Sequence, residues 1–412
     1  MENRTGSEAF HNQATPSQPA VTTPPTHSVR RYEELDSLRG LAALSVLLYH
    51  LYASRPVESL QLGRYGRAIL TVINDSPLRI AMQGMTAVIL FFVLSGFVLS
   101  LPYYAGRAPS YGDFMIKRFC RIYLPYIVAI LIALLLRTSL YRGEVESLGP
   151  DFATSWGIPL TARSLFDHLL LISNAKDERL DPVTWTLTHE MRISIFFPVI
   201  MVFVTRWNGW VTLAAALLIS RFGVLIDRIV YRDVPFGDVF NSSYAIFMFV
   251  TGALLAKYRS PICARFSALR PSARWLIAGG GFALYSVAFL FPEKLFQVHV
   301  RSYLSTLGAV SLIVTSLSSP IVSRLLTLRP LVYLGRISFS LYLYHMIIFN
   351  SLIQLFGRVW PPSLILGTTL VVSLLVAEVA YRSVERPSMT LGRYLTRRKP
   401  KSEAVLGVPE LA

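Results

Sequence analysis

The amino-acid sequence predicts an all-α, polytopic membrane protein with about ten transmembrane helices. Of its 412 residues, 53% are hydrophobic and only 16% are charged, whereas about 25% charged residues are usual in soluble proteins. Long apolar stretches recur along the whole chain. About 20 consecutive apolar residues are enough for a helix to cross the hydrocarbon core of a bilayer.

Ten apolar segments lie between two polar ends. Residues 1–30 are rich in Ser, Thr, Pro, Gln and Asn and contain no apolar run, which predicts a disordered tail and not a signal peptide. Residues 391–412 predict a second, basic and disordered tail, so the membrane domain is expected at 31–390. The predicted spans are 38–54, 78–101, 119–137, 183–204, 209–230, 240–258, 274–292, 300–318, 333–355 and 362–383.

The basic residues predict an orientation. They gather near 30–39, 107–121, 257–274, 324–336 and 393–401. Cytoplasmic loops carry the excess of Lys and Arg, so these stretches are expected in the cytoplasm, and ten spans then leave both termini there.

The longest loop on the opposite side, 138–182, contains seven acidic residues. Its apolar patch SLFDHLLLI, residues 164–172, predicts an amphipathic helix lying on the outer surface.

The formal net charge is +16, from 40 Lys and Arg against 24 Asp and Glu. In a soluble protein this excess would suggest nucleic acid. Here the basic residues flank apolar spans, so membrane lipids and topology explain most of it and no nucleic-acid partner is expected. An anionic cofactor at one face is a second explanation. The two cysteines, Cys120 and Cys263, are expected to form neither a disulfide nor a metal site.

The first span, LDSLRGLAALSVLLYH, carries Arg39 and His50. Eleven helical residues separate them, which places both on one face about 16 Å apart and His50 near mid-membrane. Because intramembrane ionisable groups are costly, the pair favours a general base or relay over a packed, hydrogen-bonded histidine. Asp36 is positioned to pair with Arg39.

The third span begins with KRFCRIYLPY, in which Arg118 and Arg121 are one helical turn apart. Arginines near a helix N-terminus can bind the phosphates of a cytoplasmic donor. The alternative is a topology anchor that contacts lipid headgroups, and the spacing alone favours that anchor.

The fourth span begins with DPVTWTLTHEMRISIFFP, which holds His189, Glu190 and Arg192 near its outer end. It is no HExxH zinc motif, because position 193 is Ile193. The trio fits acid/base or hydroxyl-binding chemistry, and a buried ion pair between helices has comparable weight.

Two further motifs lie in predicted helices. FFVLSGFVLS contains Ser95 and Gly96, a small-residue pair for which helix packing is the favoured interpretation. In LGRISFSLYLYHMIIF, His345 is expected near mid-membrane, where it could approach His50 from another helix, although a packing role is favoured for His345 taken alone.

Taken in order, these motifs resemble the membrane acyltransferase-3 family, the O-acetyltransferases of lipopolysaccharide O-antigen, exopolysaccharides and some antibiotics. The resemblance covers about residues 31–390 and rests on Arg-x10-His, FFVLSGF, RFCRIYLP with Arg-x-x-Arg, WTLTHE, SFSLYLYH and the closing VERP. It implies a bacterial inner (cytoplasmic) membrane enzyme that transfers an acyl group from acyl-CoA, usually acetyl-CoA, to a hydroxyl of a surface glycan or glycolipid. Acetyl-CoA would be a co-substrate, with no permanently bound cofactor.

The resemblance also assigns roles to residues. Arg39, His50 and Glu190 are expected to be catalytic, and Arg118 and Arg121 to bind the donor. The residues expected to bind substrate are Asp36, Trp185, His189 and His345. Many members have two consecutive acids where this chain has Glu190 followed by Met191, which argues against a paired-carboxylate role.

Some relatives carry a C-terminal SGNH esterase-like domain. This sequence ends soon after its last span, which predicts that it acts alone or with a separate partner. The alternative function is a transporter or flippase of a lipid-linked glycan, which would also need polar groups at mid-membrane. The absence of inverted-repeat symmetry and the Arg-x10-His motif argue against that alternative.

Overall fold

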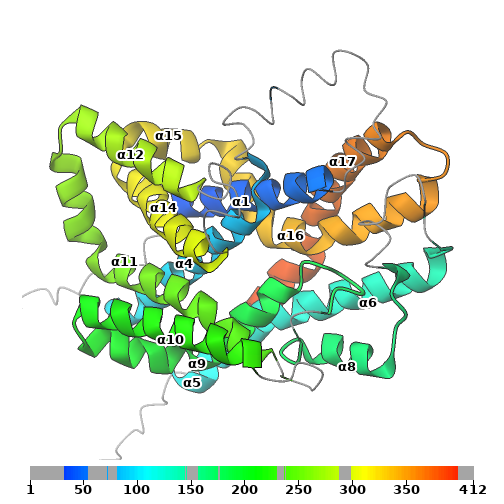
Figure 1. Cartoon of the computed structure of the whole chain (residues 1–412), viewed down its shortest axis with the longest axis horizontal. Helices are drawn as coiled ribbons and strands as arrows, with labels where there is room; N and C mark the ends of the chain where they lie inside the picture. The colour runs from blue at the N-terminus through cyan, green and yellow to red at the C-terminus, as the bar shows by residue number, and fades with distance from the viewer. Residues whose placement is uncertain are drawn as a thin grey trace, which may run out of the picture. The chain divides into compact units, whose positions relative to one another are not determined.

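All the regular structure in the described part of the chain is helical (Figure 1). The computed structural model describes residues 32–53, 72, 81–143, 145, 156–174, 177–229, 236, 238–286 and 298–397. The longer helices are α1 (Glu33–Ala53), α4 (Gly84–Tyr104), α6 (Leu124–Leu140), α9 (Trp185–Arg206), α10 (Gly209–Ile229), α11 (Ser243–Ala268), α12 (Pro271–Tyr285), α14 (Val298–Ser318), α16 (Arg329–Phe356) and α17 (Pro362–Ala380). The shorter elements are α5 (Tyr111–Arg118), η2 (Phe119–Tyr123), α8 (Ala162–Leu170), η4 (Val239–Ser242), α15 (Pro320–Leu326), η5 (Tyr381–Glu385) and α18 (Arg386–Leu395).

Each of the ten predicted spans coincides with one of the longer helices, and the prediction of an all-α polytopic membrane protein is confirmed. Among the described residues, eight helical segments are long and apolar enough to cross a membrane. The other two are α1, whose first seven residues include four charges, and α12, which is 15 residues long. Parts of the predicted spans 78–101 and 274–292 lie outside the described residues. Helix α18 continues to Leu395, past the predicted start of the C-terminal tail.

Helices α1 and α16 cross with their backbones in direct contact. A Cβ atom added at Gly40 would lie 2.5 Å from the backbone nitrogen of Gly335, and one added at Gly335 would fall on the carbonyl oxygen of Asp36. Only glycine permits so close an approach. This crossing fixes the α1 face that carries Arg39 and His50 against α16.

A second glycine crossing joins α4 to α11. A Cβ added at Gly96 would fall on the carbonyl oxygen of Phe249, and one at Gly252 would fall on that of Val93. The packing interpretation of the Ser95–Gly96 pair therefore holds for Gly96. The same crossing turns the neighbouring Ser95 toward α9, where it donates a hydrogen bond.

Two π-helical turns, η2 and η5, each lie just before a proline-containing turn of helix. Pro125 follows η2 and Pro387 follows η5. A proline lacks the N–H for the carbonyl four residues earlier, and a widened turn relieves the resulting clash. The two turns carry Arg121 and Glu385, which face each other across the helix contact.

Candidate active site

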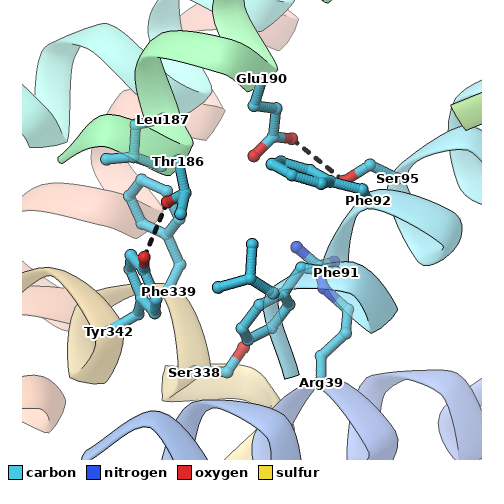
Figure 2. Close-up of a pocket in the computed structure, with 11 residues that line it drawn as sticks. Arg39, Phe91, Phe92, Ser95, Thr186, Leu187, Glu190, Ser338, Phe339 and Tyr342 are labelled. Atoms are coloured by element: carbon cyan, nitrogen blue, oxygen red, sulfur yellow. Dashed lines mark hydrogen bonds between the residues drawn. The ribbon is translucent and has the colours of Figure 1, made fainter. Parts of the chain in front are cut away.

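A cavity of about 40 Å³ lies among α1, α4, α9 and α16. Its lining residues are Arg39, Val88, Phe91, Phe92, Ser95, Thr186, Leu187, Glu190, Ser338, Phe339 and Tyr342. Figure 2 shows Arg39 of α1 and Glu190 of α9 pointing toward the space from opposite sides. The cavity thus combines an aromatic wall with a few converging polar groups, which is typical of a small-molecule site.

Glu190 is held by two direct partners. Arg118 Nη2 donates to Glu190 Oε1 at 2.6 Å, and the Ser95 hydroxyl donates to the same oxygen at 3.1 Å. Arg118 also donates through Nε to the Ser194 hydroxyl at 3.1 Å and is only 7% exposed. The Arg118–Glu190 ion pair is therefore buried and hydrogen-bonded, as a charge pair in a low-dielectric interior must be.

The second arginine of the Arg-x-x-Arg motif has looser partners. Arg121 Nη1 lies 3.8 Å from Glu385 Oε1 and also contacts the sulfur of Met389. Glu385 itself is buried and accepts a 2.7 Å hydrogen bond from the Ser340 hydroxyl. The Arg121 side chain is 30% exposed, so it remains reachable by a ligand, whereas the Arg118 side chain, 9% exposed, is largely enclosed.

Arg39 differs from both. Among the described residues, its guanidinium has no hydrogen-bond or ion-pair partner within 4 Å, although Arg121, Glu190, Asp36 and Glu385 lie within electrostatic reach. The Arg39 side chain is partly exposed and lines the cavity, so its guanidinium is open to a ligand there. The cavity has room for about three water-sized groups. Arg39 is thus arranged to meet a small polar or anionic ligand.

The two mid-helix histidines meet. His345 Nε2 lies 3.2 Å from His50 Nδ1. His345 Nδ1 lies 2.7 Å from the carbonyl oxygen of Tyr342, and His50 Nδ1 lies 2.9 Å from that of Val46. The carbonyls can only accept, so the hydrogen-bond pattern assigns a proton to Nδ1 of each ring. His50 Nδ1–H is then shared between Val46 and His345 Nε2, and His50 Nε2 keeps its lone pair.

Tyr342 separates the histidine pair from the cavity. Its hydroxyl is hydrogen-bonded to the Thr186 hydroxyl at 2.7 Å and donates to the Val183 carbonyl at 3.0 Å. Neither histidine lines the cavity. His345 is 2% exposed, whereas His50 is partly exposed and can be approached from a side other than the cavity.

Other predicted substrate-binding residues lie away from the cavity. His189 is buried with its Nδ1 2.8 Å from the Ser242 hydroxyl, and the Trp185 ring packs edge-on against it. Arg192 forms a buried ion pair with Asp238 at 2.8 Å. It also donates to the Ile172 and Ser173 carbonyls, which fixes the preceding loop to α9. Of the α9 motif, the structure brings Glu190 into the cavity and leaves His189 and Trp185 outside it.

Sequence reasoning missed several lining or supporting residues, namely Ser95 as a hydrogen-bond donor, Thr186, Ser340, Tyr342 and Glu385. The sequence did carry a signal for Tyr342. Ser338, Tyr342 and His345 follow one another at i, i+4 and i+7, which places all three on a single helix face. No sequence signal connects Glu385 with Arg121, because the π turns that join them break helical periodicity.

A family model described as an acyltransferase domain, Acyl_transf_3, matches residues 32–382. The chain belongs to the acyltransferase-3 family. The match includes Arg39, His50, Arg118, Glu190 and His345, so the resemblance predicted from the ordered motifs is confirmed.

Several relatives are named O-acetyltransferases. The chain is 21% identical over 389 residues to peptidoglycan O-acetyltransferase OatA of Listeria monocytogenes, covering 88% of this chain and 56% of the relative. It is 24% identical to the putative peptidoglycan O-acetyltransferase YrhL of Bacillus subtilis, covering 87% and 55%. The chain thus spans a little over half the length of these two acyltransferase-3 relatives.

A third relative, nodulation protein 10 of Rhizobium leguminosarum bv. viciae, is 25% identical, covering 90% of this chain and 97% of the relative. No solved structure is detectably similar to this acyltransferase-3 chain.

Proposed function

We propose that this acyltransferase is an O-acetyltransferase of the inner membrane that moves an acetyl group from cytoplasmic acetyl-CoA to a hydroxyl of a surface glycan. The observation that carries the proposal is the Arg39 guanidinium, which faces a small cavity and has no direct partner among the described residues. It lies on the same helix as His50, whose Nε2 has no hydrogen bond within the described part of the chain. Both termini are placed in the cytoplasm, because the basic stretches then lie on that side.

The cavity admits only a small part of the donor. About 40 Å³ accommodates roughly three water-sized groups. The aromatic side chains of Phe91, Phe92 and Phe339 line the same space. The nucleotide part of CoA is far too large for it and must lie elsewhere.

The histidine pair supports general-base chemistry. His50 Nε2 would take the proton of an acceptor hydroxyl as its oxygen attacks the thioester carbonyl carbon. His345 Nε2 accepts the Nδ1–H of His50 and would stabilise the imidazolium that forms. The carbon–sulfur bond then breaks, and the departing CoA thiolate takes the proton from His50 Nε2. No net proton is gained or lost by the enzyme.

Arg39 would bind a polar or anionic group of the donor in the cavity, about three helical turns from His50. Its guanidinium already points into the cavity and need not reorganise to do so. Arg118 cannot do this without leaving Glu190 and Ser194. We therefore assign Arg118 the task of positioning Glu190, and Arg121, with its more exposed side chain, the contact with an anionic part of CoA. This refines the sequence interpretation, in which both arginines bind phosphate.

The names of two relatives support an acceptor class. Two are named as peptidoglycan O-acetyltransferases or putative ones, which supports a carbohydrate hydroxyl. A surface glycan such as exopolysaccharide or lipopolysaccharide, or its lipid-linked precursor, is proposed for this chain.

Inside-out membrane vesicles test the proposal, because their cytoplasmic face is accessible. Vesicles containing the protein should release CoA from added [14C]acetyl-CoA and acquire alkali-labile label in glycan on the lumenal side. Vesicles without the protein, and vesicles carrying His50→Gln, serve as controls. Transport of intact labelled acetyl-CoA or of an unmodified glycolipid, without CoA release, would reject acyl transfer in favour of a transporter.

A further inference from the structure

A second cavity lies where α11 and α14 end and α12 and α15 begin. Its volume is about 300 Å³, within the lower range of ligand pockets of about 300–1,000 Å³. The lining residues are Phe266, Pro271, Arg274, Trp275, Ala278, Thr315, Ser319, Pro320 and Ile321. None of them belongs to the candidate active site.

The lining combines apolar side chains with a single charge. Arg274 is the only ionisable residue among those that line the cavity. Among the described residues, it has no side-chain hydrogen bond or ion pair. An arginine beside an apolar groove favours a ligand that carries a negative charge at one end and hydrocarbon at the other.

The surroundings reinforce the positive charge. No acidic residue occurs in 257–286 or 314–336, the stretches that supply the cavity walls. Glu34 accepts a hydrogen bond from Ser323 of α15 and is itself only 8% exposed. A ligand approaching Arg274 therefore meets a basic surface.

The position of the groove matches the headgroup level of a bilayer. Four helix ends meet there, and the end of a spanning helix lies near the membrane–water interface. Trp275 is 59% exposed and the adjacent Leu276 is 77% exposed, so this face of α12 is turned toward lipid. Figure 1 shows α12, α14 and α15 grouped together, with α14 packed on both of the others.

We infer that this groove binds one anionic phospholipid, with the phosphate on Arg274 and the start of an acyl chain against Trp275, Ala278 and Ile321. A zwitterionic lipid carries a cation beside its phosphate and would gain less from Arg274 and its basic surroundings. The other phosphate-bearing candidate is CoA. The apolar lining favours the lipid, because nucleotide and pantetheine groups would leave polar atoms unpaired against Phe266, Pro320 and Ile321.

Native mass spectrometry of the purified full-length protein tests this inference without measuring acyl transfer, so its outcome is separate from that of the proposed function. The protein would be released from nanodiscs containing equal amounts of phosphatidylglycerol and phosphatidylcholine. Wild type should retain one phosphatidylglycerol preferentially. Arg274→Gln should retain it about fivefold less, as expected for the loss of one arginine contact with an anionic headgroup.

Two further variants distinguish the effect of the Arg274 charge from that of the shape of the groove. Arg265→Gln removes an exposed arginine from the last turn of α11, which ends beside the groove. This variant should retain phosphatidylglycerol as wild type does. Ala278→Phe keeps the charge but fills the groove, and it should lose retention as Arg274→Gln does. Circular dichroism and an unchanged elution volume establish that each variant is folded.

Three results would overturn the inference. Equal retention by wild type and Arg274→Gln would show that the arginine makes no lipid contact. Equal retention of phosphatidylcholine and phosphatidylglycerol by wild type would show that charge plays no part. Displacement of the bound lipid by millimolar CoA, with CoA then held by wild type and not by Arg274→Gln, would assign the site to the nucleotide instead.

Discussion

Two halves of the candidate active site hold their ionisable groups in opposite ways. In the α1–α16 half, Arg39 has no direct partner among the described residues, and the His50–His345 pair is held by one side-chain hydrogen bond and backbone carbonyls. In the α5–α9 half, Arg118 and Glu190 bind each other and are further bonded by Ser194 and Ser95. Arg39 and Glu190 face each other across one small cavity, and the histidine pair lies outside it.

We infer from this difference which side chains meet the substrates and which hold the geometry of the site. A largely enclosed charge pair that is also hydrogen-bonded to neighbouring side chains is costly to disturb and is suited to fixing geometry. An unpaired guanidinium and a neutral imidazole with a free nitrogen can form new bonds without breaking old ones. We therefore expect changes in the α1–α16 half to remove activity while the fold persists, and changes in the α5–α9 half to weaken the fold itself.

The largest effect on activity is expected for His50→Gln. Loss of the general base should lower kcat for CoA release about 10³-fold, with the unfolding temperature in detergent nearly unchanged, because His50 is partly exposed. Tyr49→Phe, at the adjacent and more exposed position, is the matched control and should retain wild-type turnover. Wild-type turnover by a folded His50→Gln protein would contradict general-base catalysis at this ring.

Arg39→Gln should be nearly as damaging to activity. Loss of a charged contact with the donor should raise KM for acetyl-CoA by roughly 10²-fold, a loss of about 3 kcal/mol of binding. Because Arg39 makes no hydrogen bond in the described structure, the unfolding temperature should change little. Arg39→Lys keeps the charge and should recover part of the lost affinity. A Gln variant whose only defect is unfolding would show that Arg39 is structural.

Arg118→Gln tests the other half of the comparison. The change leaves Glu190 buried without its cation, and breaking a buried pair in this way destabilises a protein by about 3–5 kcal/mol. Thermal unfolding in detergent measures the loss. The double variant Arg118→Gln with Glu190→Gln removes both charges and should regain much of the stability. Additive losses in the double variant would show that the two side chains do not act as a pair.

The sequence predicts positions within one helix better than contacts between helices. Arg39 and His50 lie on one helix, so helical geometry alone placed them on one face. The approach of His345 to His50 was anticipated as one outcome, but it depends on the backbone contact of Gly40 with Gly335, which no single-helix pattern reveals.

The α5–α9 half was beyond sequence reasoning for a physical reason. Arg118 and Glu190 come from separate helices, and no pattern within one helix gives the relative depth of two. Likewise, the Arg121–Glu385 contact requires two π turns that shift each side chain away from its regular helical position. Only the packed structure joins these residues.

Arg121→Gln should have a smaller effect than Arg118→Gln. Its ion pair is long, at 3.8 Å, and its side chain is 30% exposed, so little stability depends on it. If Arg121 contacts an anionic part of CoA, KM for acetyl-CoA should rise about tenfold with little change in kcat, as expected for the loss of about 1.4 kcal/mol of ground-state binding. An unchanged KM would assign donor binding to other residues. Arg107→Gln, an exposed change nearby in sequence, is the control.

The last comparison concerns an acid that has no arginine partner among the described residues. Asp181, in the loop before α9, is fully buried, its Oδ1 lies 3.4 Å from the Val183 backbone nitrogen, and its Oδ2 has no partner among the described residues. Burial raises the pKa of this carboxyl to about 8. In contrast to Glu190, it should therefore be neutral in the folded protein at pH 7.

The raised pKa of Asp181 determines the direction in which the stability of the protein changes with pH. Because the pKa of Asp181 is higher in the folded protein than in the unfolded chain, the stability due to its neutral form is complete below about pH 4 and is lost as the pH rises through about 8. The loss is at most about 1.4 kcal/mol per pH unit. Unfolding temperatures measured from pH 5 to 9 should fall more steeply for wild type than for Asp181→Asn, whose amide stays neutral. Parallel curves would mean that Asp181 is ionised throughout, and that a carboxylate in this protein can be buried without the arginine that Glu190 requires.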